Sequence, residues 1–174
     1  MFDCEGMVCT VMPGCSVFWG EKNGIKYNVK VFVPQNDVCE CWLVEITDVS
    51  GTERQLSLHA QQTWSFHVYL GGIGTKAPSK NTQTSITEHA IIAKADDVGR
   101  PFYTMYGGFS MNGHIKCSVI SECEETLITA KSASPEYEDF YFHIADIESD
   151  IVLKPGETVK RTVVSSASTE ESGQ

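Results

Sequence analysis

The chain has 174 residues, 41% of them hydrophobic, and a net charge of −10 from 13 basic and 23 acidic side chains. That length suits one globular domain, and the composition argues against wholesale disorder. An acidic chain repels phosphate, and no basic run is longer than Lys160-Arg161, so nucleic acid and anionic membrane surfaces are poor partners. No apolar run reaches the ~20 residues that cross a bilayer. A sugar or another protein is compatible with this charge.

The seven cysteines are scattered and odd in number, and no basic-then-apolar signal segment follows Met1. These features predict reduced thiols, packed as small hydrophobes, in a cytoplasmic protein. Cys39 and Cys41 would lie on one face of a strand, but the Cys-x-x-Cys or Cys/His pairs of a zinc site are absent. We therefore expect no metal and no cofactor.

The first half of the chain predicts successive β-strands. Between Ile25 and Val33 every second residue is apolar, which is typical of a half-buried strand, and Asn23-Gly24 supplies a positive-φ turn before it. Similar runs occupy Val8–Met12, Ser16–Trp19, Val38–Thr47, Gln55–Ala60 and Thr63–Leu70.

The run Val38–Thr47 is apolar on both faces, with Trp42 and Val44 on one and Cys41 and Leu43 on the other. This pattern predicts a strand buried on both sides, and hence a face that needs cover. Of the three tryptophans, we expect Trp42 and Trp64 to be core residues.

Gly71–Thr84 interrupts the pattern and predicts a long polar loop. Lys154-Pro155-Gly156-Glu157 predicts a type I or II turn. We expect a single β-sandwich domain over residues 1–165 and a disordered tail over 166–174, where Ser, Glu and Gly dominate. Further strands are predicted at Ser85–Ala95, Phe102–Tyr106, His114–Ile120, Phe140–Ile147, Asp150–Leu153 and Thr158–Val164. With no amphipathic helix, the fold class is all-β, a two-layer antiparallel β-sandwich.

Residues 6–165 resemble the amino-terminal β-sandwich of the inverting cellobiose, chitobiose and cyclic β-1,2-glucan phosphorylases. The matching pieces are many and short: Asn23-Gly24-Ile25, Val31-Phe32-Val33-Pro34, Asp37 to Glu40, Asp48 to Ser57, Leu58 to Phe66, Glu124 to Lys131 with Pro135, and Ile151 to Val164. The sequence departs from the family at Glu125 and Ala130, near positions where many members carry Arg and Gly.

The resemblance implies a supersandwich similar to galactose-mutarotase folds. In that family the general acid lies in a helical (α/α)6 barrel that follows the sandwich, and 174 residues leave no room for one. The sandwich commonly shapes a dimer interface and the rim of a partner's active site. Partners implied are a second copy of the chain or a helical-barrel catalytic chain, with an oligosaccharide as a further ligand.

No motif in the sequence announces catalysis. The five histidines are dispersed, and acidic residues such as Asp146, Glu148 and Asp150 lie in loops or at strand ends. A Gly-x-Ser-x-Gly elbow is absent, and Gly71 to Gly74 does not lead from a strand into a helix.

The leading hypothesis is a non-catalytic sandwich subunit or domain of a glycoside phosphorylase-like assembly, with no catalytic residue of its own. One alternative is a mutarotase- or lyase-like enzyme using a His and a carboxylate. Another is a carbohydrate-binding module, which would need exposed aromatics. The residues that we expect at a sugar-facing rim are Gln62, His67, Tyr103 and Tyr106.

Overall fold

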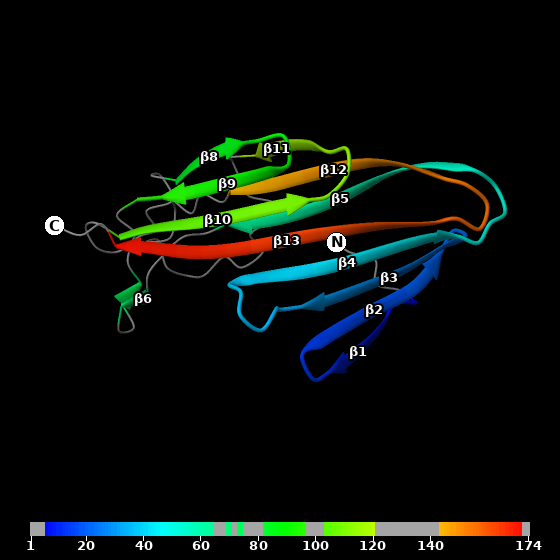
Figure 1. Ribbon diagram of the computed structural model, residues 1–174, viewed down its shortest axis with the longest axis horizontal. Coiled ribbons are helices and arrows are strands. Elements are labelled where there is room, and N and C mark those ends of the chain that lie inside the picture. The colour runs from blue at the N-terminus through cyan, green and yellow to red at the C-terminus, as the bar shows by residue number, and fades with distance from the viewer. Residues whose placement is uncertain are drawn as a thin grey trace, which may run out of the picture. The chain divides into compact units, whose positions relative to one another are not determined.

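The computed structural model describes residues 6–64, 69–70, 73–74, 82–96, 103–120 and 143–171. Within them the chain forms strands and no helix, which confirms the all-β prediction (Figure 1). The chain divides into two compact units. Unit 1 comprises Met1–Ala60, Ser110–Lys116 and Ile147–Ser166, and unit 2 comprises Gln61–Phe109, Cys117–Asp146 and Ala167–Gln174.

The strands form one large and two smaller sheets. The eight-stranded sheet has the order β1-β2-β3-β4-β13-β10-β9-β8, a three-stranded sheet has the order β11-β12-β5, and β6 pairs with β7. The bounds are β1 Val8–Met12, β2 Cys15–Lys22, β3 Ile25–Phe32, β4 Cys39–Asp48, β5 Arg54–Trp64, β6 Tyr69–Leu70, β7 Ile73–Gly74, β8 Thr82–Ile86, β9 Ala90–Ala95, β10 Tyr103–Met111, β11 Lys116–Ile120, β12 His143–Leu153 and β13 Thr158–Glu171.

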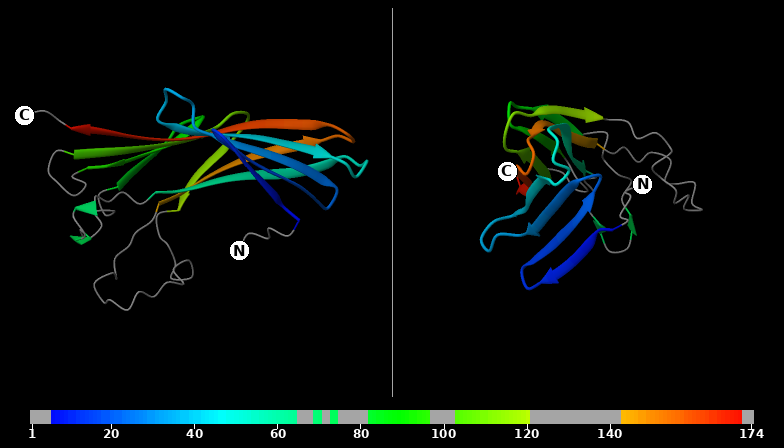
Figure 2. Two further views of the ribbon diagram at one scale, coloured as in Figure 1. Left: turned by 90° about the horizontal axis from the view of Figure 1, so that it is seen from below. Right: turned by 90° about the vertical axis from the view of Figure 1, so that its right-hand side faces the viewer.

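Unit 1 is a sandwich with a mainly apolar interior. The large sheet buries Val44, Ile46 and Val163, and the small sheet buries Ile147, Ile151 and Leu153. These residues recur at every second position, so each strand turns one face to the core. Figure 2 shows the corresponding segments of β4, β13, β5 and β12 as two layers of unit 1.

The core of unit 2 is made of small and large side chains in close contact. Ile91, Ala93 and Ala95 are fully buried on β9, and Phe109 on β10. Trp64 on β5 is 6% exposed, as predicted for a core residue. Its indole packs against the backbone of Gly107, where a Cβ would lie 2.5 Å from Nε1.

Several predicted strand limits are wrong, each for a local reason. Ser85–Ala95 is two strands, because Thr87 closes a hairpin: its amide and its hydroxyl both donate to Ala90 O, and the hydroxyl accepts from Ala90 N at 3.0 Å. Gln55–Ala60 and Thr63–Leu70 are not separate runs, since β5 continues through Ala60 to Trp64. Phe140–Ile147 and Asp150–Leu153 likewise belong to one strand where they are described, β12.

The carboxyl-terminal strand is longer than predicted. β13 continues past Val164 to Glu171, into the tail predicted to be disordered. Ser165 lies opposite Glu40 and Ser166 opposite Cys39, so this polar segment is held by the β4 ladder.

The loop Gly71–Thr84 is also shorter than predicted. Ile73 and Gly74 pair with Leu70 and Tyr69, and Thr82 begins β8. Residues 75–81 and 121–142 lie outside the described residues.

The strand β4 is buried on one face only, which corrects the prediction of burial on both. Val44 and Ile46 are buried, whereas Leu43 on the opposite face is 39% exposed. Trp42 is half-buried rather than a core residue, and its Nε1–H donates to Glu40 Oε1 at 2.5 Å.

The cysteine prediction holds in part. Cys9, Cys15, Cys39, Cys41 and Cys117 are free thiols, but Cys9 is exposed and the other four are half-buried. Burial raises the pKa of the Cys117 thiol, and burial together with neighbouring Cys39 raises the pKa of Cys41. Within the described part of the chain, no three His, Cys, Asp or Glu residues form a metal-binding group. No helix among those residues is long and apolar enough to span a membrane.

Candidate functional site

The four residues predicted for a sugar-facing rim fall on different parts of the chain. His67 lies outside the described residues, and only the backbone of Tyr103 is described, as the first residue of β10. Gln62 is half-buried on β5 and its amide donates to Thr63 O at 3.1 Å. Tyr106 is half-buried on β10.

Strand alternation sets Gln62 and Tyr106 apart. Gln62 lies on the same face of β5 as Trp64, which packs against Gly107. Tyr106 precedes Gly107, so its side chain points to the other face of β10. The described geometry does not direct these two side chains into one pocket.

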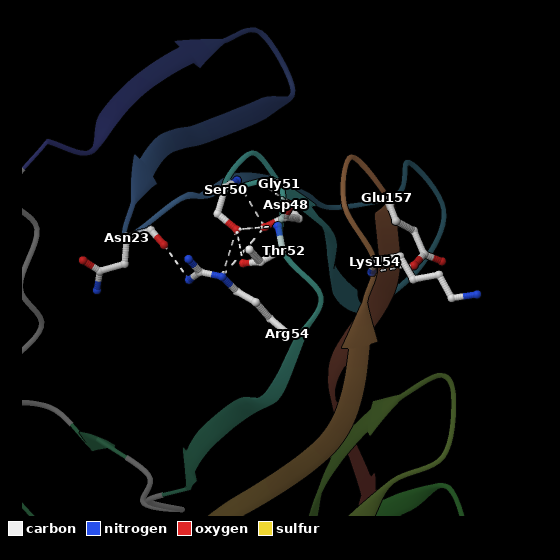
Figure 3. A network of polar contacts seen from close by, with 8 residues as sticks. All are labelled: Asn23, Asp48, Ser50, Gly51, Thr52, Arg54, Lys154 and Glu157. Atoms are coloured by element: carbon white, nitrogen blue, oxygen red, sulfur yellow. Dashed lines mark hydrogen bonds and ion pairs between the residues drawn. The ribbon is translucent and has the colours of Figure 1, made fainter.

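The most connected polar group of unit 1 is a hairpin clamp around Asp48 (Figure 3). Asp48 is 1% exposed and accepts hydrogen bonds from Ser50 N at 3.2 Å, Ser50 Oγ at 2.5 Å and Gly51 N at 3.0 Å. The Arg54 Nε lies 3.8 Å from the carboxylate, and its Nη1 donates to Asn23 O at 2.6 Å. The Ser50 hydroxyl, with the amides of Ser50, Gly51 and Gly156, holds the pKa of Asp48 below its ordinary value.

This clamp is structural rather than catalytic. Both carboxylate oxygens of Asp48 accept from donors of its own turn, as in an Asx turn. The neighbouring turn after β12 is tied to it, because Asp48 N donates to Glu157 O at 3.1 Å. The Glu157 amide donates to Lys154 O at 2.9 Å and Gly156 has φ of +73°, which makes the predicted Pro155-Gly156 turn type II.

A second polar group lies on the solvent face of the three-stranded sheet in unit 1. Lys116 Nζ donates to Asp150 Oδ2 at 2.9 Å and Ser57 Oγ to Asp150 Oδ1 at 3.0 Å. The Lys116 ammonium lowers the pKa of Asp150, with smaller contributions from Ser57 and His59, and Asp150 in turn raises the pKa of Lys116.

Lys116 and Asp150 are residue types that serve in acid–base catalysis, but they lie in a solvent-exposed site rather than a water-excluding one. The side chains of Lys116 and Asp150 are 68% and 64% exposed, so water screens them. A general acid needs a carboxyl pKa raised toward neutrality, and that of Asp150 is lowered. In unit 2 the pKa of Asp96 is lowered in the same way, by hydrogen bonds from Lys94 and Thr104.

The exposed apolar side chains point to a different kind of site. Among the residues that the structure describes, twelve large hydrophobic side chains are exposed, and eight of them precede residue 44: Met7, Val8, Val11, Met12, Trp19, Val33, Val38 and Leu43. All five residues of β1 are exposed, and Val11 reaches 78%. Single exposed apolar residues are ordinary, but Val8 on β1 lies directly opposite Trp19 on β2, and neighbouring exposed apolar side chains are typical of a contact surface.

Strand β1 is also an edge of the large sheet (right-hand view of Figure 2). It pairs on one side with β2 and, among the described strands, has none on the other. Its sequence Val-Cys-Thr-Val-Met has no charge, no Pro and no Gly, the usual devices that protect an edge. The exposed clustering could not be read from the sequence, because alternation reveals a strand but not its place in the sheet order.

Comparisons with known proteins agree with the fold. Residues 3–108 match the family described as glycosyl hydrolase 94, supersandwich domain. No curated protein matches the chain significantly.

Two solved structures share the fold at low sequence identity. A candidate kojibiose phosphorylase from the human microbiome matches with a TM-score of 0.53 and 8% identity, over 92% of this chain and 18% of that one. Heparinase III matches with a TM-score of 0.51 and 11% identity, over 95% of this chain and 22% of that one. The chain therefore spans about a fifth of the length of these proteins. With the supersandwich profile matched over more than half of its length, the chain belongs to the glycosyl hydrolase 94 supersandwich family.

Proposed function

We propose that the chain serves as a non-catalytic supersandwich domain in a carbohydrate-active assembly, and that it associates through the β1 edge. Membership of the family supports the carbohydrate-active part. The polar groups around Asp48, Asp96 and Asp150 support the non-catalytic part, since each carboxylate has a lowered pKa and is held by neighbouring donors.

The single observation that carries the proposed association is the open, uncharged edge strand β1. Its partner is a second copy of the chain or a helical-barrel catalytic chain. Self-pairing is favoured by the sequence of β1, because an antiparallel pair centred on Thr10 would place Val8 opposite Met12 and Cys9 opposite Val11. The two strands would then continue the large sheet across a two-fold axis.

Light scattering coupled to size-exclusion chromatography, over a range of concentrations, tests the association. We expect a dimer whose population rises with concentration, and Val11→Lys should shift it to monomer because a charge is placed in the apolar contact. Val152→Lys is the matched control, since Val152 is 53% exposed on β12, in the other sheet, and should leave the dimer intact.

A strict monomer at every concentration, together with no partner in a pull-down from the native host, would refute association. A dimer that Val11→Lys leaves unchanged would move the interface away from β1. Recovery of a helical-barrel chain with the wild type, lost with Val11→Lys, would favour the catalytic partner over self-pairing.

A further inference from the structure

The three tryptophans have different surroundings, and only one of them is open to a ligand. Trp64 is buried against Gly107, and the Trp42 indole N–H is bonded to Glu40. Trp19 on β2 is 45% exposed, and its indole N–H has no hydrogen-bond partner among the described residues. Stacking on a sugar ring requires an exposed aromatic face, and the free indole N–H could in addition donate to a sugar hydroxyl.

The register of the strands places hydrogen-bonding side chains in line with Trp19. Trp19 lies opposite Asn28, Asn28 opposite Glu45, and Glu45 opposite Lys160. Residues directly opposite in antiparallel strands point to the same face, so the four side chains form one row across β2, β3, β4 and β13. We call these four residues the Trp19 row; Figure 1 shows the strands that carry it side by side.

The row is apolar at Trp19 and polar at the three residues that follow, and its residues are separated by the distance between neighbouring strands. Neighbouring strands are about 4.8 Å apart, so Lys160 lies about 14 Å from Trp19 along the row. Asn28 is exposed and its side-chain amide makes no hydrogen bond with the described residues, which leaves two donors and an acceptor for a ligand. The pair of Lys160 Nζ and Glu45 Oε1, 2.5 Å apart, ends the row with a donor and an acceptor fixed together.

We propose that the Trp19 row is a binding site for a neutral, linear oligosaccharide. One sugar ring stacks on Trp19, and hydroxyl groups of the next rings hydrogen-bond Asn28 and then the Glu45–Lys160 pair. This inference rests on the proposed role in a carbohydrate-active assembly, and it adds the ligand class and the place where the ligand binds.

Charge favours a neutral ligand over an anionic one. Lys160 is paired with Glu45, and Lys26 lies directly opposite Glu21 in the β2–β3 register. Lys30 lies over the Phe32 ring, 5.7 Å from its centroid. With Lys160 and Lys26 opposite glutamates, and a chain charge of −10, the face offers little attraction to a sulfated or uronic polysaccharide.

Calorimetric titration of the full chain tests the site, with pentasaccharides of glucose in β-1,2, β-1,3 and β-1,4 linkage as neutral probes and a heparin-derived oligosaccharide of similar length as the anionic probe. We expect at least one neutral probe to bind and to protect tryptophan fluorescence from quenching by acrylamide. Trp19→Ala should weaken that binding about tenfold or more, as for a central aromatic contact, and Trp19→Tyr should retain part of it.

Two further variants separate the site from the rest of the surface. Asn28→Ala changes an exposed side chain and should weaken binding with the melting temperature unchanged. His59→Ala, on the solvent face of the small sheet, is the control and should bind as the wild type does.

Three results would overturn the inference: no neutral probe binds, Trp19→Ala binds as tightly as the wild type, or the heparin-derived probe binds in preference. Light scattering on Trp19→Ala keeps the two proposals distinguishable. A variant that still associates but no longer binds sugar fits both, whereas association without any sugar binding in the wild type would overturn only the Trp19 row.

Discussion

At the scale of single residues, the interior of unit 2 depends on a glycine that touches a tryptophan. Gly107 leaves room for the Trp64 indole, and a Cβ at that position would meet Nε1 at 2.5 Å and Cδ1 at 2.9 Å. Trp64 is 6% exposed and is enclosed by its neighbours, so it cannot swing into solvent. A close-packed interior does not absorb an added methyl group without strain.

Gly107→Ala should therefore destabilise the fold by about 1–3 kcal/mol, measured by urea unfolding. Gly20→Ala is the matched control, because its Cβ would meet Gly6 O at 3.2 Å, Tyr27 Cζ at 2.8 Å and, at the same 2.5 Å, the hydroxyl oxygen of Tyr27. Tyr27 is only half-buried and that oxygen is the free end of its side chain, so Gly20→Ala should cost less. Equal losses for the two variants would contradict this account of Trp64.

A second residue-scale prediction concerns acid. The folded protein holds the pKa of Asp48 below 3.8, mainly through the Ser50 hydroxyl. A carboxyl with a lowered folded pKa stabilises the fold above its unfolded pKa and loses that contribution as pH falls through the folded value. The Asp48 contribution is thus complete near neutrality and disappears below pH 3.8.

Asp48→Asn should consequently have a lower melting temperature than the wild type at pH 7, and the difference should narrow as the pH is lowered past 3.8. Melting curves followed by circular dichroism over that range measure it. Asp37→Asn, in the exposed turn after β3, is the control and should change the melting temperature little at pH 7. If the difference in melting temperature between the wild type and Asp48→Asn widened in acid, it would contradict a lowered pKa of Asp48 in the folded protein.

At the scale of elements, the polar end of β13 is part of the fold. The ladder with β4 runs from Thr158 opposite Thr47 to Ser166 opposite Cys39. A chain shortened after Val164 would leave the backbone groups of Glu40 and Cys39 without these partners. We expect this truncation to lower the melting temperature by several degrees. Equal melting temperatures would show that the end of β13 is dispensable.

The sequence predicts most strands here, and its errors have identifiable causes. The alternation from Ile25 to Val33 predicts β3, which is observed at Ile25–Phe32. The prediction succeeds because successive side chains of a half-buried strand point alternately to the core and to solvent. The break at Thr87 has no signal in the sequence, because a Thr hydroxyl, with no Gly or Pro, makes that turn. The end of β13 has none either, because its composition resembles that of disordered chains and its partner lies more than a hundred residues earlier.

Burial and sites were harder to predict than strands, since both depend on which strands become neighbours. The apolar pattern of β4 does not reveal that Leu43 faces an uncovered side of the sheet. The sequence does not distinguish Trp19 from the other two tryptophans, because only the strand register shows that Trp19 lies opposite Asn28. The proposed rim residues Gln62, His67, Tyr103 and Tyr106 stay a prediction, with His67 outside the described residues.

At the scale of the whole molecule, the proposed function makes a prediction about activity. The purified chain should show no phosphorolysis and no hydrolysis of β-linked disaccharides, measured by release of glucose or glucose 1-phosphate. The reason is that no carboxyl pair with raised pKa and water-excluding walls occurs among the described residues. Robust turnover that is abolished by Asp150→Asn, with the fold intact, would favour the enzyme alternative.

The pairing of β4 with β13 also determines when this protein can fold. The hydroxyls of Thr47 and Thr158 meet at 2.7 Å but are 111 residues apart in the chain. A ribosome adding about 5–20 residues per second takes roughly 6–22 s to synthesise that interval, and contacts of such long range also form slowly. Throughout that time β4, with Val44 and Ile46, lacks the neighbour that completes its ladder. Unit 1 can therefore complete its fold only once β13 has left the ribosome, and until then the unpaired edge of β4 is open to association with other nascent chains.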